Sequence, residues 1–228
     1  MPFKDTPVKA DSLKVGFIDT SSRLLHGTAS HYLFGVSLFN SLFDREYIVR
    51  CLTLAQSSNV EPVIYIPDKP YVHTMRALGY SEKEAKRKVS KQLRWTINKV
   101  KDAVEPFEID LDSILHLHSD IQSRERYDLV RQQVQNEYEN NDLFRGLCHR
   151  EAKETLISKN KSDVCHDDIE QATLFLLEEI PVIIASSYIL GFGTTLFLYR
   201  RAAPVFEHIF QEQVFGVYME QSGFGTLS

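Results

Sequence analysis

Short apolar runs bounded by turn residues recur along the 228-residue chain and predict buried β-strands. The clearest are residues 31–37 (HYLFGVS) and 60–67 (VEPVIYIP), the second of which ends at an Asp-Lys-Pro turn. Continuous apolar runs of this kind are typical of strands that are buried on both faces of a sheet. Further strands are predicted at residues 107–111, 182–185, 195–199 and 214–219.

Segments with apolar residues three and four positions apart predict helices between these strands. Asp44 and Ser81 are the expected N-caps of two of them, which run to about residue 57 and about residue 104. Pro181 is expected to stop a third helix that begins near residue 167. The other helices are predicted at residues 71–78, at 119–157 with a break near Asn140-Asn141, and after Pro204.

The alternation of strands and helices implies an α/β sandwich with a mostly parallel central sheet flanked by helices. No internal repeat or long linker divides the sequence, so a single domain over residues 1–228 is predicted, with residues 1–12 as a flexible N-terminal segment. Parallel sheets bind ligands beyond the C-terminal ends of their strands. Residues that follow predicted strands are therefore the first candidates for chemistry.

One stretch, residues 180–199, carries no charge and is long enough to cross a bilayer. A proline, two glycines, two serines and two threonines interrupt it, so two apolar runs joined by a glycine-rich loop describe it better, and no membrane partner is expected. The three cysteines are scattered and match no disulfide framework or zinc spacing. Together with an N-terminus that lacks an apolar leader, they favour a cytoplasmic protein without a bound metal.

The formal net charge of −5 argues against a protein that is basic all over, but it conceals a local excess of cations. Residues 82–101 carry eight basic and two acidic side chains, a net charge of +6 that leaves −11 for the rest of the chain. Five of these cations fall within an arc of about 80° on the predicted helix. They are Lys83, Arg87, Lys91, Arg94 and Lys101. Such a stripe suits contacts with nucleic-acid phosphates, although a solvated helix face has the same pattern.

A Gly-x-Ser-x-x-Asn sequence lies at the end of the first predicted strand. Ser37 is a candidate nucleophile, Gly35 allows close approach because it has no side chain, and Asn40 can hydrogen-bond a substrate carbonyl or amine. A serine that only closes a turn gives the same pattern. Phe39 occupies the last glycine position of the G-x-S-x-G elbow, so the motif is not that of an α/β-hydrolase.

Two further candidates lie later in the chain. Phe175 and Glu179 are four residues apart and share one face of a helix, whereas Glu178 points about 100° away. A carboxylate drawn inward beside Phe175 needs a cationic partner, and a substrate ammonium is one. The hydroxyl of Tyr199 can reach a pocket while its ring stays buried. A solvated glutamate and a core tyrosine are the alternative interpretations.

Taken together, the Gly35-x-Ser37-x-x-Asn40 sequence, the LEEIP sequence that contains Glu179, and Tyr199 followed five residues later by Pro204 resemble the cyclodipeptide synthase family. The resemblance runs from about residue 31 to about residue 218 and extends to the total length. It implies a Rossmann-like fold similar to the catalytic domain of class I aminoacyl-tRNA synthetases. It also implies that two aminoacyl-tRNAs are joined into a 2,5-diketopiperazine by ping-pong acyl transfer, with neither ATP nor a metal as cofactor.

The resemblance also implies roles for single residues. Ser37 falls on the nucleophile that receives the first aminoacyl group, Glu179 on the carboxylate that holds its ammonium, and Tyr199 on a tyrosine that helps to relay a proton during cyclisation. Gly35 and Asn40 fall on residues that shape the first aminoacyl site, and the basic helix has the place of the helix that docks tRNA. Leu33, Ile64 and Phe175 are expected pocket walls and suggest apolar or aromatic substrate side chains. Arg200 is a further expected substrate-binding residue.

Two positions depart from the family pattern. Phe175 stands where tyrosine is usual, so the hydrogen bond of that tyrosine is absent or supplied by another residue, and Arg200 stands where His, Gln or Pro is usual. Two other functions stay open. A serine acyl-hydrolase needs a histidine base near Ser37, and a non-catalytic tRNA-binding module needs the basic stripe but not Ser37. Aminoacyl-tRNAs are the expected partners, DNA is not, and no sequence signal bears on the oligomeric state.

Overall fold

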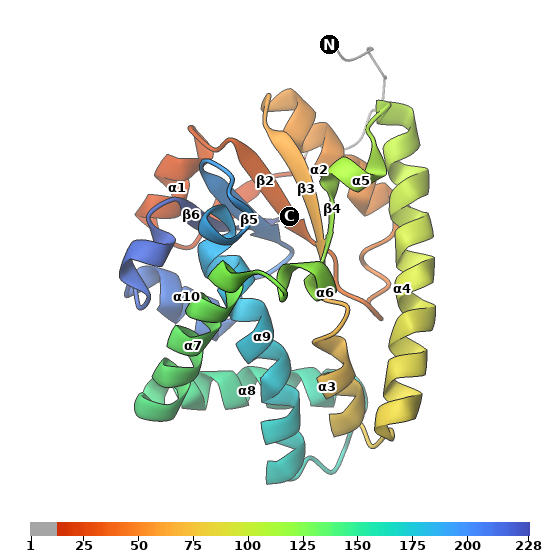
Figure 1. Cartoon of the computed structure of the whole chain (residues 1–228), viewed down its shortest axis with the longest axis vertical. Helices are drawn as coiled ribbons and strands as arrows, with labels where there is room; N and C mark the ends of the chain where they lie inside the picture. The colour runs from red at the N-terminus through yellow and green to blue at the C-terminus, as the bar shows by residue number, and fades with distance from the viewer. Residues whose placement is uncertain (1–12) are drawn as a thin grey trace.

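The computed structural model describes residues 13–228, in which a central sheet lies between layers of helices (Figure 1). Its strands are β1 (Val15–Phe17), β2 (His31–Gly35), β3 (Glu61–Ile66), β4 (Leu115–Leu117), β5 (Thr195–Tyr199) and β6 (Ser222–Leu227). They are ordered β1-β6-β5-β2-β3-β4, and all neighbours are parallel except β1 and β6. The predicted α/β class with a mostly parallel sheet is confirmed. The segment 1–12 lies outside the described residues.

The order of the strands reverses between β2 and β5. From β2 the chain winds outward through β3 to β4, whereas from β5 it continues in the opposite direction to β6. Because β2 and β5 are parallel and in register, with His31 opposite Thr195, their C-terminal ends share one edge of the sheet. In doubly wound sheets such a reversal opens the crevice that binds ligands. Ser37 follows β2 and Tyr199 ends β5, so both lie at this crevice.

Helices cover both faces of the sheet (Figure 1). They are α1 (Thr20–His26), α2 (Arg45–Ser57), α3 (Tyr71–Ala77), α4 (Glu82–Val104), α5 (Leu111–Ile114), α6 (His118–Ile121), α7 (Glu125–Asn140), α8 (Asp142–Ser158), α9 (His166–Leu190) and α10 (Pro204–Gln211). Leu33 and Phe197 point into the core cluster with α7 to α10, whereas Phe34 and Ile64 point into the cluster with α2 and α4. Side chains alternate between the faces because successive residues of a strand point to opposite sides.

The two helix starts predicted from capping residues are confirmed. The Asp44 carboxylate accepts a hydrogen bond from the backbone N–H of Tyr47 (2.8 Å), and Ser81 and Glu84 form a reciprocal capping box. The 23-residue helix α4 is therefore about 34 Å long and runs along one side of the molecule (Figure 1). Its apolar face is packed against the core, and all five cations of the predicted stripe are exposed.

Pro181 does not stop a helix, contrary to the sequence prediction. Helix α9 continues through it to Leu190 and is kinked at Ala185, the one residue inside it with non-helical angles (φ −135°, ψ 27°). Proline removes one helical hydrogen bond, but every residue from 179 to 187 is buried, so core packing outweighs that loss. The predicted strand at 182–185 is therefore helical. Although α9 is long and apolar enough to span a membrane, 78% of its most apolar window is buried inside the protein.

Two other predicted strands are wrong. Residues 107–111 run from the last residue of a 3-10 turn (Glu105–Phe107) to the first residue of α5, and the strand that pairs with β3 is β4, a few residues later. Residues 214–219 hold another 3-10 turn (Gly216–Met219), and the last strand is β6. The sequence of β6, SGFGTL, contains two glycines and has no apolar run, and β1 has only three residues, so neither carries a strong strand signal.

Candidate active site

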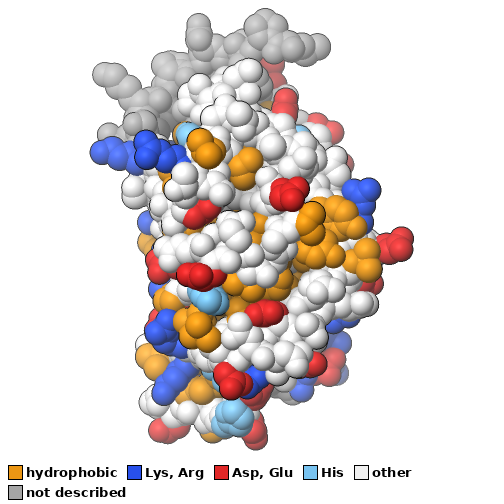
Figure 2. Space-filling view, turned by 90° about the vertical axis from the view of Figure 1, so that its left-hand side faces the viewer, with side chains coloured by type: hydrophobic (Ala, Val, Ile, Leu, Met, Phe, Trp, Pro, Cys, Tyr) orange, Lys and Arg blue, Asp and Glu red, His pale blue; other side chains and the backbone are white. Residues whose placement is uncertain are grey.

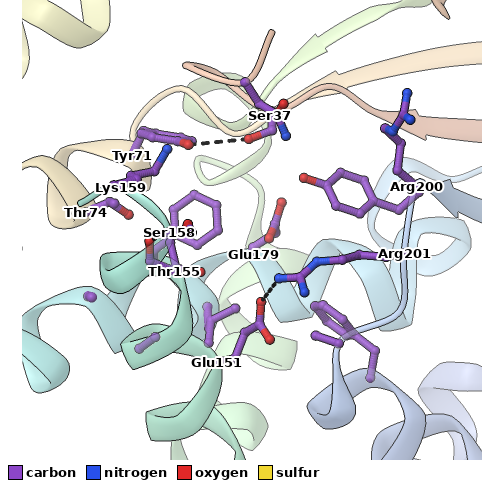
Figure 3. Close-up of a pocket in the computed structure, with 18 of the residues that line it drawn as sticks. Ser37, Tyr71, Thr74, Glu151, Thr155, Ser158, Lys159, Glu179, Arg200 and Arg201 are labelled. Carbon is purple, nitrogen blue, oxygen red and sulfur yellow. Dashed lines mark hydrogen bonds and ion pairs between the residues drawn. The ribbon is translucent and has the colours of Figure 1, made fainter. Parts of the chain in front are cut away.

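A cavity of about 330 Å³ lies at the crevice beyond β2 and β5 (Figure 3). Six residues predicted for the site line it, although they come from three distant parts of the chain. These are Ser37, Asn40, Phe175, Glu179, Tyr199 and Arg200. Helices α3 and α8 and the segment after β5 contribute polar groups that the sequence did not indicate. These are Tyr71, Thr74, Glu151, Thr155, Ser158, Lys159 and Arg201. The size suits a small polar or amphipathic ligand group.

Leu33 and Ile64 do not line this cavity. Both are fully buried, and they belong to the core clusters on opposite faces of the sheet. Leu33 pairs with Val63 and Phe34 with Ile64 in the register of β2 and β3, so the alternation of the strands separates the two predicted pocket walls. They form core instead of the side walls expected from the sequence.

Gly35 makes room for aromatic rings. A Cβ at this position would lie 2.8 Å from Cδ2 of Tyr199 and 3.0 Å from Cζ of Phe197. Such contacts are too close for ordinary packing, and a side chain here would push Tyr199 out of place. The close approach predicted for Gly35 is thus made by neighbouring side chains of the protein.

The Glu179 carboxyl group is buried without a partner in the described part of the chain. The residue is 9% exposed, and no hydrogen bond or ion pair with residues 13–228 reaches its carboxylate. Burial, followed by the nearby negative charge of Glu151, raises the pKa of Glu179 to about 8. A lone buried carboxylate beside an open cavity is suited to bind a ligand cation. Glu178 points away and pairs with His73 (3.2 Å), so the predicted difference between the two acids is confirmed.

A second carboxylate, Glu151 on α8, was not expected from the sequence. Its Oε1 pairs with Arg201 (3.0 Å), while its Oε2 is buried without a partner among the described residues (Figure 3). Burial raises the pKa of Glu151 and the charge of Arg201 opposes that shift. The sequence pattern could have indicated that Glu151 is buried, because it lies on the same face of α8 as the buried residues Phe144, Cys148 and Ala152.

The Ser37 hydroxyl hydrogen-bonds the carbonyl oxygen of Leu38 (3.2 Å) and the hydroxyl of Tyr71 (3.4 Å), and the Tyr199 hydroxyl is a third polar neighbour. No histidine lines the cavity within residues 13–228. The serine acyl-hydrolase interpretation, which needs a histidine base, is therefore not favoured. On the opposite wall, burial and then the charge of Glu179 raise the pKa of Tyr199, which keeps this phenol protonated.

The loop after β2 holds Asn40 in a tight turn. Phe39 adopts a left-handed backbone conformation (φ 55°), which is uncommon for a bulky residue, and the Asn40 side-chain oxygen accepts a hydrogen bond from the N–H of Leu42 (3.0 Å). Arg200 secures this loop, because its guanidinium donates to the Leu42 carbonyl (3.3 Å) and lies over the Tyr47 ring.

Histidines elsewhere in the described part of the chain make hydrogen bonds within the core or lie at the surface. His118 is buried and bonded to the hydroxyls of Tyr65 (2.8 Å) and Tyr127 (3.2 Å), the second of which also donates to the Glu178 carbonyl (3.0 Å). Within residues 13–228, no group of three or more histidine, cysteine or acidic side chains is arranged to hold a metal ion. His118 is therefore a hydrogen-bonded core residue under α9.

Comparisons with known proteins agree with this geometry. Residues 14–228 match the family described as cyclodipeptide synthase. A curated cyclo(L-leucyl-L-leucyl) synthase of Staphylococcus haemolyticus (strain JCSC1435) is 21% identical over 222 residues, which are 95% of each protein. The crystal structure of a cyclodipeptide synthase from Bacillus thermoamylovorans has a TM-score of 0.86 at 23% identity and covers 96% of both chains.

A further solved structure bears on the fold. It is that of a Mycobacterium tuberculosis protein described as demonstrating that cyclodipeptide synthetases are related to type I tRNA synthetases. It has a TM-score of 0.79 at 20% identity and covers 99% of both chains. The expected likeness to class I synthetases is confirmed. With nearly the whole chain matched and the three motif residues at one cavity, the chain belongs to the cyclodipeptide synthase family and is an aminoacyltransferase.

Proposed function

We propose that this protein joins two aminoacyl-tRNAs in the cytoplasm into a 2,5-diketopiperazine, through an aminoacyl ester on Ser37 and a dipeptidyl-enzyme. One observation carries the proposal: a half-buried serine hydroxyl and a buried carboxylate with no partner among residues 13–228 face the same cavity. An aminoacyl ester offers a carbonyl for the first group and an ammonium for the second. Glu179 would hold the ammonium and thereby orient the carbonyl towards Ser37, which is the role that the family resemblance implies.

In the first step, Ser37 Oγ attacks the carbonyl carbon of the aminoacyl ester. The bond from that carbon to the terminal ribose oxygen breaks, and the proton of Ser37 passes to the departing ribose oxygen, assisted by the neighbouring hydroxyl of the tRNA. The ester is already activated, so orientation contributes more than a strong base does. This fits a site in which no described histidine contacts Ser37.

In the second step, the amine of the aminoacyl group on Ser37 attacks the carbonyl of the second aminoacyl-tRNA. The second tRNA leaves, and a dipeptide stays esterified to Ser37. An ammonium must lose a proton before it can attack, and Glu179, which would hold that ammonium, is the group placed to accept it; burial raises the pKa of this carboxyl and so makes it a better proton acceptor than an ordinary glutamate. In the third step, the free amine of the dipeptide attacks the ester carbonyl, which closes the ring and releases Ser37.

The chemistry needs no ATP, because the bond energy is already stored in the aminoacyl ester, and no metal is proposed. The cavity wall beyond Glu179 combines the polar groups named above with apolar residues. The apolar ones are Ala152, Ala172, Leu176, Ala203 and Phe206. This lining supports aliphatic side chains, such as the leucine named for relatives, while the Glu151–Arg201 pair gives the wall a polar edge. Selection between side chains that differ by one methylene involves only about 1–3 kcal/mol.

The proposal is tested by expressing the protein in bacteria and analysing the medium by mass spectrometry. Diketopiperazines are expected only when the protein is present, and their masses identify the two amino acids. With purified aminoacyl-tRNA, the intact protein should gain the mass of one aminoacyl group. Folded protein that yields neither a diketopiperazine nor an acylated form would exclude this function.

Helix α4 supplies the surface proposed to bind tRNA. None of its five stripe cations is ion-paired with another described residue, so all are free for phosphates. Trp95 is 58% exposed beside them, with Nζ of Lys91 4.8 Å from its ring, and offers a stacking surface. Figure 2 views the molecule from the side away from α4, where acidic side chains are spread over the surface and basic ones form no stripe.

Replacing Lys91 and Arg94 together by glutamate is expected to weaken aminoacyl-tRNA binding on the order of tenfold at moderate salt. The slope of log Kd against log salt concentration should fall by about 2, because two phosphate contacts are lost. Filter binding over a salt series measures both. The matched control reverses Arg131 and Lys153, two exposed cations on α7 and α8. An equal loss in both double variants would mean that α4 has no special part in binding.

A further inference from the structure

Tyr71 lies against the nucleophile, with its hydroxyl at hydrogen-bond distance from Ser37 Oγ. The Ser37 hydroxyl is 3.2 Å from the carbonyl oxygen of Leu38, which can only accept a hydrogen bond. Either hydroxyl can donate in the contact between Tyr71 and Ser37 Oγ (3.4 Å), and when the serine proton is bonded to Leu38 the donor is Tyr71 (Figure 3). This distance is long for two hydroxyls, as is common in catalytic sites before substrate binds.

The ring of Tyr71 is held from several sides. The residue is 4% exposed and begins α3, which follows β3 and so starts at the same sheet edge as Ser37. Phe39 packs against its ring at 5.3 Å, Phe175 stands edge-on to it at 5.4 Å, and the Lys159 ammonium lies 5.5 Å from its centre. The hydroxyl that Phe175 lacks is thus present on the adjacent ring, aimed at Ser37.

We propose that Tyr71 is a further catalytic residue, whose hydroxyl donates a hydrogen bond to Ser37 Oγ and stabilises this oxygen when it is the leaving group in ring closure. The inference rests on the proposed function, because it requires an ester on Ser37. During ring closure the electrons of the carbon–Oγ bond pass to Oγ, and the proton lost by the attacking amine ends there. Tyr71 keeps its own proton and contributes only the hydrogen bond.

The direction of this bond predicts which step it assists. A donor to Oγ draws electron density from the serine oxygen, so it does not help Ser37 to attack the first ester. The same donor stabilises the negative charge that develops on Oγ as the ester breaks. Loss of the hydroxyl should therefore slow ring closure while acylation of Ser37 proceeds nearly as before.

The test is Tyr71→Phe, which removes the hydroxyl and keeps the ring contacts. Diketopiperazine formation is expected to fall on the order of 100-fold, the lower end for removal of one donor to a developing oxyanion. Intact-protein mass spectrometry should show that the dipeptidyl form accumulates, whereas single-turnover acylation by the first aminoacyl-tRNA changes less than about threefold. Tyr80→Phe, an exposed tyrosine just beyond α3, is the matched control and should behave as the unmodified protein.

Two results would overturn the role of Tyr71. One is unchanged turnover in Tyr71→Phe; the other is an equal slowing of acylation and ring closure, which indicates a general effect on the site's shape. Thermal melting of the variant checks that the fold is intact. Acylation of the unmodified protein is measured first, so failure of the proposed function appears there as a missing acyl-enzyme, independently of Tyr71.

Discussion

Ser37→Ala is expected to abolish diketopiperazine formation, with a rate loss of several orders of magnitude, and to leave the protein folded. Without Oγ there is no atom to carry either acyl intermediate. The change should cost less than about 1 kcal/mol of stability, because Ser37 is half-buried and its hydrogen bonds to Leu38 and Tyr71 are long. Product analysis, intact mass after incubation with aminoacyl-tRNA, and thermal melting measure the three consequences.

The control for this variant is Ser41→Ala. Ser41 lies four residues further along the same loop and is exposed, so its loss should alter neither product nor melting temperature. A folded Ser37→Ala protein that still makes product at a substantial rate would contradict covalent catalysis. Product formed without any acylated protein would instead indicate direct transfer between two bound tRNAs.

Glu179→Gln is expected to reduce activity at least 100-fold and, at the same time, to stabilise the fold above pH 8. The loss of activity follows because an amide cannot neutralise the substrate ammonium or accept its proton. The gain in stability follows because the pKa of Glu179 is about 8 in the folded protein against 4.5 for an ordinary glutamate. The unfolded chain therefore releases this proton more readily than the folded one.

The pH dependence has a definite sign. Between about pH 4.5 and pH 8 the folded state binds more protons at this group than the unfolded state, so stability falls as the pH rises through this window. Glutamine removes that dependence. The free energies of unfolding of the two proteins should be similar near pH 4.5 and diverge by up to about 5 kcal/mol above pH 8. Urea denaturation at a series of pH values measures the divergence.

Glu178→Gln is the matched control. This neighbouring acid is half-buried and paired with His73, so the variant should keep most of its activity. Its stability should not show the divergence expected for Glu179→Gln. If Glu179→Gln instead lost stability at pH 8, the carboxylate would have a partner inside the protein, and the substrate ammonium would not be needed to explain its burial.

Local sequence signals predicted those parts of the fold that depend on neighbouring residues. The capping residue Ser81 and the helical spacing of the apolar residues after it predicted α4 and the exposure of its cations. The apolar runs defined β2, β3 and β5. The prediction that Pro181 ends a helix was wrong. The proline removes a hydrogen bond within its own helix, whereas the burial that outweighs this loss comes from contacts with helices and strands elsewhere in the chain. β6 was not predicted because its two glycines interrupt any apolar run. Its position in the sheet depends on pairing with β5 and β1, which are distant in sequence.

The site was predicted in part for the same reason. Ser37, Glu179 and Tyr199 were found because each belongs to a recognisable short motif, and the strand order then brings them to one cavity. Tyr71 and Glu151 belong to no motif, and their importance depends on what their side chains reach across the crevice. The prediction that Leu33 and Ile64 line the pocket was wrong, because the sequence does not show which face of the sheet an apolar strand residue will occupy.

The contacts between α4 and the loop that bears the site have one more consequence. Lys99 donates to the Phe43 carbonyl (2.8 Å) in the loop after β2, and Arg45 at the start of α2 donates to the Asp102 carbonyl (3.2 Å), so the helix is tied to the segment that follows β2 at two points. A helix that binds the phosphates of a tRNA would therefore stand at a constant distance from Ser37. The proposed reaction uses two aminoacyl-tRNAs in succession, and a constant distance of this kind would bring both esters to the same atom whatever side chains they carry.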